Sequence, residues 1–276
     1  FIGALYRRQG SVGAGFTTAH ARMWQSFFRL GGLQLFLRLL PMLTPLLATV
    51  ASTSESSAGS TEAAGGSAAN SSSNRRSKQA VVAEIVAGAV RGAKYWPYAD
   101  LATLWTAHLL PIWERTVTSA VTEILNDWEA ALSFILHRRD PRRSWWLLRW
   151  IDSFDLSLGT DTKQCVAVLR LTSTVLRAYG WRCEGFAASQ VTKLTAQGLL
   201  SHPYKQVRVE VGQLLAIAMM AAPTAPPCEV LISEMTRLCT PATATADIVA
   251  RQESVGKGAA SVLYPFACST PFNQPP

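Results

Sequence analysis

Apolar side chains recur every three to four residues along most of this chain, the spacing at which they line one face of an α-helix. In the segment 78–90 they fall at Val82, Ile85, Val86 and Ala89. The same period runs through residues 98–113, 118–136, 163–179 and 204–220. No convincing alternation of apolar and polar residues, which would indicate a strand, accompanies it. The pattern predicts an all-α fold of helices joined by short turns.

Proline and capping residues mark the expected starts of two helices. Asp140-Pro141 places a helix-capping side chain before a proline, which is favoured at the first helical position, ahead of the segment 142–151. Ser201, His202 and Pro203 have the same arrangement ahead of residues 204–220. We therefore expect helices to begin directly after these two sites.

A segment of low complexity interrupts the helical pattern. Residues 51–74 are mainly Ser, Ala and Gly, and such a segment buries too little apolar surface to offset the entropy lost on ordering. We expect a disordered insertion there. The chain is accordingly divided into a helical repeat segment at 1–50, a disordered linker at 51–77 and HEAT-like helical repeats at 78–270.

The most apolar stretch, residues 27–50, is not typical of a membrane span. Arg29 and Arg38 interrupt it, and we expect Pro41 and Pro45 to break its second half. A spanning helix needs about 20 mostly apolar residues without such charges. The stretch predicts a pair of buried helices, and we expect no membrane partner.

Two segments of similar sequence indicate an internal repeat. KQAVVAEIVAGAV begins at Lys78 and KQVRVEVGQLL begins at Lys205, 127 residues later. This offset is about three periods of roughly 42 residues, within the range of about 40–47 for HEAT repeats. The Val207-Arg208 pair that opens the second segment is also typical of a HEAT helix. The fold class predicted is an all-α, HEAT-like α-solenoid of stacked antiparallel helix pairs.

Charge and cysteine content narrow the partners only slightly. The 26 basic residues exceed the 18 acidic ones, which gives a net charge of +8. This balance permits nucleic acid, polyphosphate or acidic protein partners and selects none of them.

The five cysteines lack the spacing of zinc sites, so we expect reduced and mostly buried thiols. They are Cys165, Cys183, Cys228, Cys239 and Cys268.

The segment AEIVAGAVRGAKYW, residues 83–96, contains two glycines and a lysine, as a phosphate-binding loop does. Such a loop needs GxxxxGK[ST] between a strand and a helix. Here Gly88 and Gly92 lie within a helical pattern, and Tyr95 follows Lys94 where Ser or Thr is required. We expect Gly88 to mark a close contact between helices and Gly92 to end or turn the helix, rather than a nucleotide site.

Motifs of catalysis are absent from the sequence. It contains no GxSxG, HExxH, GxGxxG or EF-hand pattern. Asp127 and Glu129 flank Trp128 with no evident partner. Four histidines stand apart from one another, which favours surface or capping roles: His20, His108, His137 and His202. We therefore predict that the protein is not an enzyme.

Two basic clusters carry alternative interpretations. Residues 75–78, RRSK, form either a solvated helix start or a fragment of a nuclear localisation signal. Residues 137–143, HRRDPRR, form either a solvated turn in which Asp140 caps the next helix, or an anion site. The candidate residues for an anion site are Arg138, Arg139, Arg142 and Arg143.

Seven of the nine tryptophans fall between Trp96 and Trp150, where they interleave with arginines. Proteins that bind single-stranded nucleic acid stack bases on such residues. However, Trp146, Leu147 and Trp150 have helical spacing. This spacing favours packing within the core or between repeats.

Three segments together resemble one family. RRSKQAVVAEIVAGAVRGAKYW at 75–96 is similar to a family helix with AEI-x-AG followed by RGSKHW. NDWEAALSFILHRRDPRRSWWLL at 126–148 resembles a DW…RDPR…HWL segment, and YKQVRVEVGQLLAIAMM at 204–220 resembles YKNVRE-x-IG. Their order and rough spacing agree with the large HEAT-repeat proteasome activators of the proteasome activator complex subunit 4 type. The resemblance covers residues 75 to about 221, and Ala93 and Tyr95 depart from the family pattern.

The resemblance implies a giant solenoid that caps the core proteasome, contacts its α-subunit ring and modulates its gate and substrate entry without ATP. It implies a nuclear and cytoplasmic location, a link to DNA repair and to degradation of acetylated histones, and basic pockets for inositol phosphate. Inositol phosphate would here contact the four candidate arginines. No other cofactor is expected, and nucleic acid is not favoured as a partner.

The ends of the chain predict an inner fragment of such an activator. The first residue is Phe1, and Asn273-Gln274-Pro275-Pro276 does not match the family's hydrophobic-Tyr-x tail, which docks between α subunits. The acetyl-lysine-binding region of the family is expected beyond this segment. Two alternatives stay open: a generic HEAT scaffold or transport receptor, and a basic helical module that binds nucleic acid.

Overall fold

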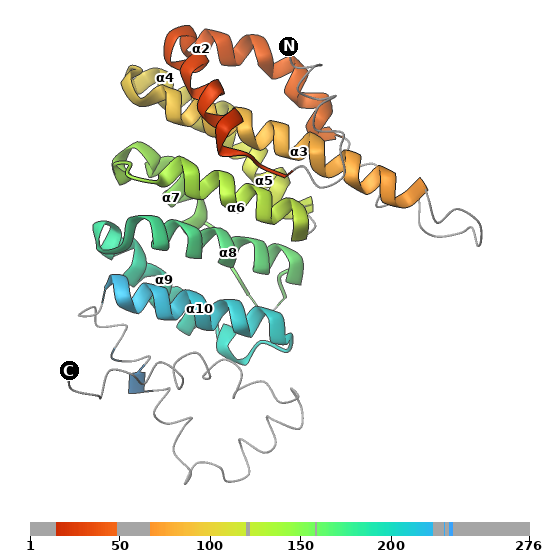
Figure 1. The fold of residues 1–276 in the computed structure, drawn as a ribbon. Coiled ribbons are helices and arrows are strands. Elements are labelled where there is room, and N and C mark those ends of the chain that lie inside the picture. Colours follow the sequence, from red (N-terminus) through yellow and green to blue (C-terminus); the bar gives the residue numbers. More distant parts are fainter. Residues whose placement is uncertain are drawn as a thin grey trace, which may run out of the picture. The chain divides into compact units, whose positions relative to one another are not determined.

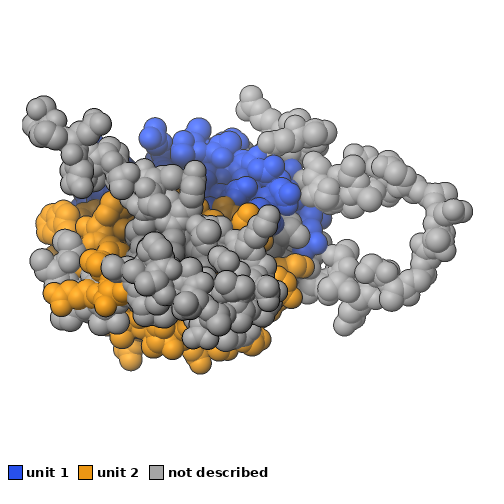
Figure 2. All heavy atoms as spheres, turned by 90° about the horizontal axis from the view of Figure 1, so that it is seen from below, with its two compact units in different colours: residues 1–139 blue, residues 140–276 orange. Residues whose placement is uncertain are grey.

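The computed structural model describes residues 15–48, 67–119, 122–157, 159–222, 229 and 232–233. Over these residues every regular element is a helix and no strand occurs, which confirms the all-α prediction. The chain divides into two compact units, residues 1–139 and 140–276, which Figure 2 colours separately. The division therefore falls within the arginine-rich turn at 137–143, and not at the low-complexity segment.

The first unit is organised around α3 (Ser67–Gly92), which packs against both α2 (Thr18–Ala48) and α6 (Thr122–Leu136) (Figure 1). Residues 80–90 of α3 are buried without exception, since neighbours cover the helix on more than one side. The short turn η2 (Ala93–Tyr95) ends α3. A continuous helix then follows as α4 (Tyr98–Thr103), the π-helical η3 (Leu104–Leu109) and α5 (Leu110–Ser119).

Helix α2 bends at Gly32, and its prolines do not end it. Gly32 has φ 61° and ψ −165°, a conformation open to glycine and strained for other residues, so α2 consists of two helical segments. This agrees with the predicted helix pair. The expectation that the pair is buried was wrong, since Leu30 is 89% exposed. The buried residues within 27–46 are Phe28, Leu33, Phe36 and Leu43. The expectation that Pro41 and Pro45 break the second half was wrong, because both lie inside the helix. Both prolines are exposed, so water can reach the carbonyl groups that lose an N–H donor.

The expected linker is shorter at its C-terminal end than the sequence indicated. Helix α3 begins at Ser67, so residues 67–77 are helical and the boundary at 77 is corrected. Ser77 is buried and Arg76 pairs with Asp127 of α6, so long-range contacts support this part of the helix. Residues 49–66 lie outside the described part, as do residues 234–270 of the expected repeats.

The second unit consists of helices joined by short turns. Helix α8 (Thr162–Tyr179) lies beside α10 (Lys205–Ala221) (Figure 1), and α9 (Glu184–Ala196) packs against α10 and α7 (Trp145–Asp152). Three 3₁₀ turns precede helices: η4 (Pro141–Ser144), η5 (Gly180–Cys183) and η6 (Leu199–Ser201). The Tyr179 hydroxyl donates to Ser144 Oγ at 2.9 Å, which ties the end of α8 to the turn before α7.

The two predicted helix starts differ in outcome. Asp140 caps as expected, since its side chain accepts from the backbone N–H of Arg142 with Pro141 at the first position, although the turn is 3₁₀ before α7 begins. The helix expected at 204–220 is present within one residue of its predicted start, but the cap expected at 201–203 was wrong. Helix α10 begins at Lys205, its N-cap is Tyr204, and no side chain caps it.

Tryptophans from the predicted cluster form much of the first unit's core. Trp105, Trp113 and Trp128 are fully buried. The rings of Trp113 and Trp128 meet edge to face with centroids 4.8 Å apart, which joins α5 to α6. In the second unit Leu147 is buried while Trp145 is 53% exposed. The preference for core packing over base stacking is thus confirmed for the buried members of the cluster.

Candidate functional site

The arginine-rich turn begins at the end of the first unit, where it binds two helix ends together. Arg91, near the end of α3, donates through Nη1 to the carbonyl oxygens of Phe134 at 3.0 Å and His137 at 2.8 Å. Arg139 donates through Nη2 to the carbonyl oxygen of Arg91. Each guanidinium therefore satisfies carbonyl groups at the end of the other's helix, where a positive charge is also favoured by the helix dipole.

This reciprocal contact is partly removed from water. The Arg91 guanidinium lies over the Phe134 ring, 4.8 Å from its centroid. Burial lowers the pKa of Arg91 below its ordinary value, and the nearby charge of Arg22 lowers it further. Arg138 is exposed and has φ 53°, which is unusual for a residue other than glycine. Of the two candidate arginines in this unit, Arg139 has a structural contact to backbone.

The second unit contains the other two candidates and their acidic neighbour. Asp140 Oδ2 accepts from Arg142 Nε at 2.9 Å and from Arg142 Nη2 at 2.7 Å. The hydrogen bond from Arg142 lowers the pKa of Asp140 below its usual range. The backbone N–H of Arg143 donates to the carbonyl oxygen of Asp140 at 3.1 Å. Arg142 thus already has a carboxylate partner, while the anion site itself stays a prediction.

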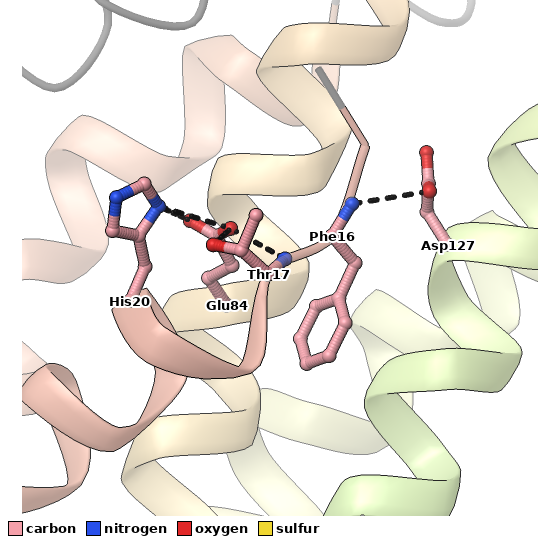
Figure 3. A network of polar contacts seen from close by, with 5 residues as sticks. All are labelled: Phe16, Thr17, His20, Glu84 and Asp127. Atoms are coloured by element: carbon pink, nitrogen blue, oxygen red, sulfur yellow. Dashed lines mark hydrogen bonds and ion pairs between the residues drawn. The ribbon is translucent and has the colours of Figure 1, made fainter. Parts of the chain in front are cut away.

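Two buried carboxylates accept hydrogen bonds from the residues that begin α2, as Figure 3 shows. Glu84 of α3 is 1% exposed and Asp127 of α6 is 5% exposed. Glu84 Oε1 accepts from the backbone N–H of Thr17 at 2.8 Å and from its hydroxyl at 2.6 Å. Asp127 Oδ1 accepts from the backbone N–H of Phe16 at 3.1 Å. These N–H groups lie at a helix start, where they lack partners within the helix and where negative charge is favoured.

Each buried carboxylate also has a cationic or ionisable neighbour. Arg76 donates through Nε to Asp127 Oδ2 at 2.9 Å and through Nη2 to Oδ1 at 3.2 Å. His20 Nδ1 lies 3.2 Å from both oxygens of Glu84. Burial of a charge without such partners is costly. The network therefore has a clear structural role, and the sequence did not reveal it because the partners are 51 to 111 residues apart.

The expectation that the histidines occupy surface or capping positions needs correction. His20 faces Glu84, the His108 ring lies 5.9 Å from the Phe36 ring, and His202 is 1% exposed. His137 is exposed, as expected. Similarly, Arg76 is not part of a simple solvated helix start. The alternative interpretation of residues 75–78 as a localisation signal stays a prediction.

Arg208 holds the turn that precedes α10, although it does not cap the N–H groups of that helix. It is 3% exposed and donates through Nη1 to the carbonyl oxygens of His202 and, at 2.8 Å, of Pro203. His202 Nδ1 in turn accepts from the backbone N–H of Tyr204 at 3.2 Å. Burial lowers the pKa of His202, and the charge of Arg208 lowers it further. The arginine of the Val-Arg pair thus holds the turn that precedes its own helix.

The glycines of the segment 83–96 bring two helices together. A Cβ on Gly88 would lie 2.3 Å from Trp24 Cβ, and one on Gly92 would lie 2.7 Å from Phe28 Cβ. Gly88 is therefore a close helix–helix contact, as predicted, and Gly92 both contacts α2 and ends α3. Helix α2 packs directly against both glycines. It therefore occupies the space in which a phosphate would have to bind.

Two of the five cysteines, Cys165 and Cys183, lie among the described residues. Both are buried thiols without a disulfide, as expected. Burial raises the pKa of each to about 11. The remaining three lie outside the described residues.

Within the described residues no group of three or more His, Cys, Asp or Glu side chains is placed to hold a metal ion. No helix among these residues combines the length and the apolar character that a membrane span requires.

Two comparisons with known proteins match part of this chain. Residues 71–174 match the family described as "Proteasome activator complex subunit 4-like, HEAT repeat-like". The chain is also 28% identical over 131 residues to Proteasome activator complex subunit 4B of Danio rerio. This aligned region covers 48% of this chain and 7% of that relative. The chain thus spans a small part of the curated relative's length.

The matched range extends from α3 into α8 and includes two of the three segments on which the resemblance was based. The third, residues 204–220, lies beyond the matched range of the family. The all-α fold of the described residues agrees with a HEAT-like α-solenoid. The resemblance is confirmed over residues 71–174, which are similar to the HEAT repeat-like family of the proteasome activator complex subunit 4 type.

Proposed function

We propose that this chain is a wall segment of an ATP-independent proteasome activator. In this proposal the complete protein caps the core proteasome, binds its α-subunit ring and modulates gate opening and substrate entry. The observation that carries the proposal is the family match over residues 71–174. The segment's mechanism is one of shape, in which packed helices hold distant binding elements in place, and it performs no catalysis.

Contacts within each unit support a positional role. Glu84 and Asp127 secure the start of α2, Arg91 and Arg139 join the ends of α3 and α6, and Arg208 holds the turn before α10. The contacts of Glu84, Asp127, Arg91 and Arg139 fix one helix against another, and Arg208 fixes the turn before its own helix. Such internal fixation suits a repeat protein, because every repeat is stabilised mainly by its neighbours.

Several finer features belong to the same proposal. The complete protein acts in the nucleus and the cytoplasm, in DNA repair and in the degradation of acetylated histones, which parts outside this chain recognise. Inositol phosphate is the proposed ligand of the basic turn, through Arg138, Arg139, Arg142 and Arg143. Substitution of Arg142 and Arg143 by Glu is expected to weaken inositol phosphate binding by the complete protein, and unchanged binding would remove this feature.

The principal test uses the full-length protein, tagged in its source cells and recovered with its partners. Mass spectrometry is expected to identify α and β subunits of the core proteasome, with untagged cells as the control. The purified protein is then expected to increase hydrolysis of a fluorogenic peptide by core proteasomes to the same extent with and without ATP. Recovery of transport cargo or nucleic acid without proteasome subunits would overturn the function and leave the fold unaffected.

A further inference from the structure

An exposed tyrosine at the end of α3 is surrounded by positive charge. Tyr95 lies in η2 and is 66% exposed. Lys94 Nζ stands 4.9 Å from the centroid of its ring. Arg29 of α2 places its Cζ over the same ring, 5.4 Å from the centroid. Two elements thus supply cations to a single phenol, and all of them belong to the first unit.

The charges act on the hydroxyl as well as on the ring. A hydrogen bond from Lys94 lowers the pKa of Tyr95 most, and the charges of Lys94, Arg29 and Arg139 lower it further. No carboxylate is among these influences on the hydroxyl. Over the described residues, no ion pair joins Arg29 or Lys94 to a carboxylate. The surroundings of the Tyr95 oxygen therefore favour negative charge there.

Tyr204 provides a contrast elsewhere in the chain. It is similarly exposed, at 59%, but its ring lies beside His202, with centroids 5.7 Å apart. No arginine or lysine of the described residues stands over its ring. Exposure alone therefore does not distinguish Tyr95. Its distinction is the convergence of Arg29, Lys94 and Arg139.

We propose that Tyr95 is a phosphorylation site whose phosphate is held by Arg29 and Lys94. A protein tyrosine kinase supplies the reaction: the Tyr95 oxygen attacks the γ-phosphorus of ATP, the bond to the β-phosphate oxygen breaks, ADP leaves, and the phenol proton passes to a base of the kinase. The product is a phosphate monoester with nearly two negative charges at neutral pH and three acceptor oxygens. Charge-assisted hydrogen bonds between such oxygens and guanidinium or ammonium groups are strong.

The origin of the two cations gives the modification a structural consequence. Arg29 comes from α2 and Lys94 follows α3. One phosphate that contacts both would join the two helices at this end of the unit and relieve repulsion between like charges. Phosphorylation at Tyr95 therefore stabilises the first unit.

The experiment compares the whole chain before and after treatment with ATP, Mg²⁺ and a tyrosine kinase catalytic domain of broad specificity. Peptide mapping by mass spectrometry is expected to find phosphate on Tyr95 of the folded chain. The Tm is expected to rise by about 2–4 °C, the shift that one favourable kcal/mol gives a domain of 150–250 residues. High salt should reduce the rise, because it screens exposed charges.

Two variants separate this effect from a general effect of phosphate. In an R29Q/K94Q variant, phosphorylation of Tyr95 is expected to leave Tm unchanged from the same variant without phosphate. In a Y95F variant, phosphate carried by Tyr204 is expected to give no rise. The proposal is overturned if Tyr95 is modified only in the urea-unfolded chain, if the modified chain shows no rise, or if the R29Q/K94Q variant shows the same rise. None of these results depends on proteasome binding.

Discussion

Gly88 of α3 lies directly against Trp24 of α2, so closely that a Cβ on Gly88 would stand 2.3 Å from Trp24 Cβ and 2.9 Å from the backbone nitrogen of Gln25. The close approach involves backbone on both sides, which a rotamer change cannot relieve. The separation between α2 and α3 at this level is therefore set by the absence of a side chain.

Substitution of Gly88 by Ala is expected to destabilise the chain. Alanine favours a helix over glycine by about 1 kcal/mol, but the added methyl forces α2 away, and overpacking of this kind costs about 1–3 kcal/mol. The net loss expected is therefore up to about 2 kcal/mol. Urea unfolding followed by circular dichroism measures the change. Gly185→Ala in α9 is the matched control, since a Cβ there meets nothing within 4 Å. A Gly88→Ala variant as stable as the control would contradict the packing argument.

Substitution of Glu84 by Gln tests how the start of α2 is held. The backbone N–H and the hydroxyl of Thr17 both donate to the Glu84 carboxylate, and glutamine removes the negative charge that they face. The glutamine NH₂ group is also a donor, so it cannot accept from these two groups. We expect a loss of about 1–3 kcal/mol, the cost of disturbing a buried hydrogen-bonded group. Faster hydrogen exchange of the Thr17 amide should accompany it. Glu114→Gln, at an exposed position of α5, is expected to change stability by less than about 0.5 kcal/mol.

The chain offers two Asp–Arg pairs of different burial for comparison. Double-mutant cycles with Asp127→Asn and Arg76→Gln should give a coupling energy of about 1 kcal/mol, in the lower part of the range for contacting residues, because the Arg76 side chain is 35% exposed. The same cycle for Asp140 and Arg142 should give a smaller value, since the Arg142 side chain is 90% exposed. Equal coupling in the two cycles would show that burial of Asp127 contributes nothing.

His202 should make stability depend on pH. Its folded pKa lies below the unfolded value of about 6.5, so the unfolded state binds the proton more readily. Stability from this group is full above about pH 6.5 and falls as the pH drops toward the folded pKa. His202→Gln should flatten the profile of urea midpoints between pH 7.5 and 5.5. A smaller slope of the same sign should persist, because burial also lowers the pKa of His108.

The correct predictions from the sequence were those that rest on local patterns. The period of apolar residues predicted the helices, and Gly88 within a fully apolar stripe predicted a close helix contact. Asp140 was identified as a cap because its partner, the N–H of Arg142, is two residues away. Such features depend only on neighbours along the chain.

Two local predictions failed, the helix breaks at Pro41 and Pro45 and the cap at 201–203. The contacts that the sequence did not reveal join partners far apart in the sequence. His20 and Glu84 are 64 residues apart, and Phe16 and Asp127 are 111 residues apart, so no local pattern connects them. The linker boundary failed for a related reason, since Arg76 has its partner 51 residues away. The convergence of Arg29 and Arg139 near Tyr95 was likewise invisible until α2, α3 and α6 were placed together.

The seating of α2 by Glu84 and Asp127 has a consequence for synthesis on the ribosome. Helix α2 is made before α3 and α6, and Asp127, which completes its contacts, lies 79 residues beyond Ala48 at the end of α2. At about 5–20 residues per second, this distance takes roughly 4–16 seconds to synthesise. Apolar side chains such as Phe28 and Phe36, fully buried in the finished unit, lack α3 at the start of that interval and α6 until its end. We expect the nascent α2 to depend on a chaperone until α6 is made.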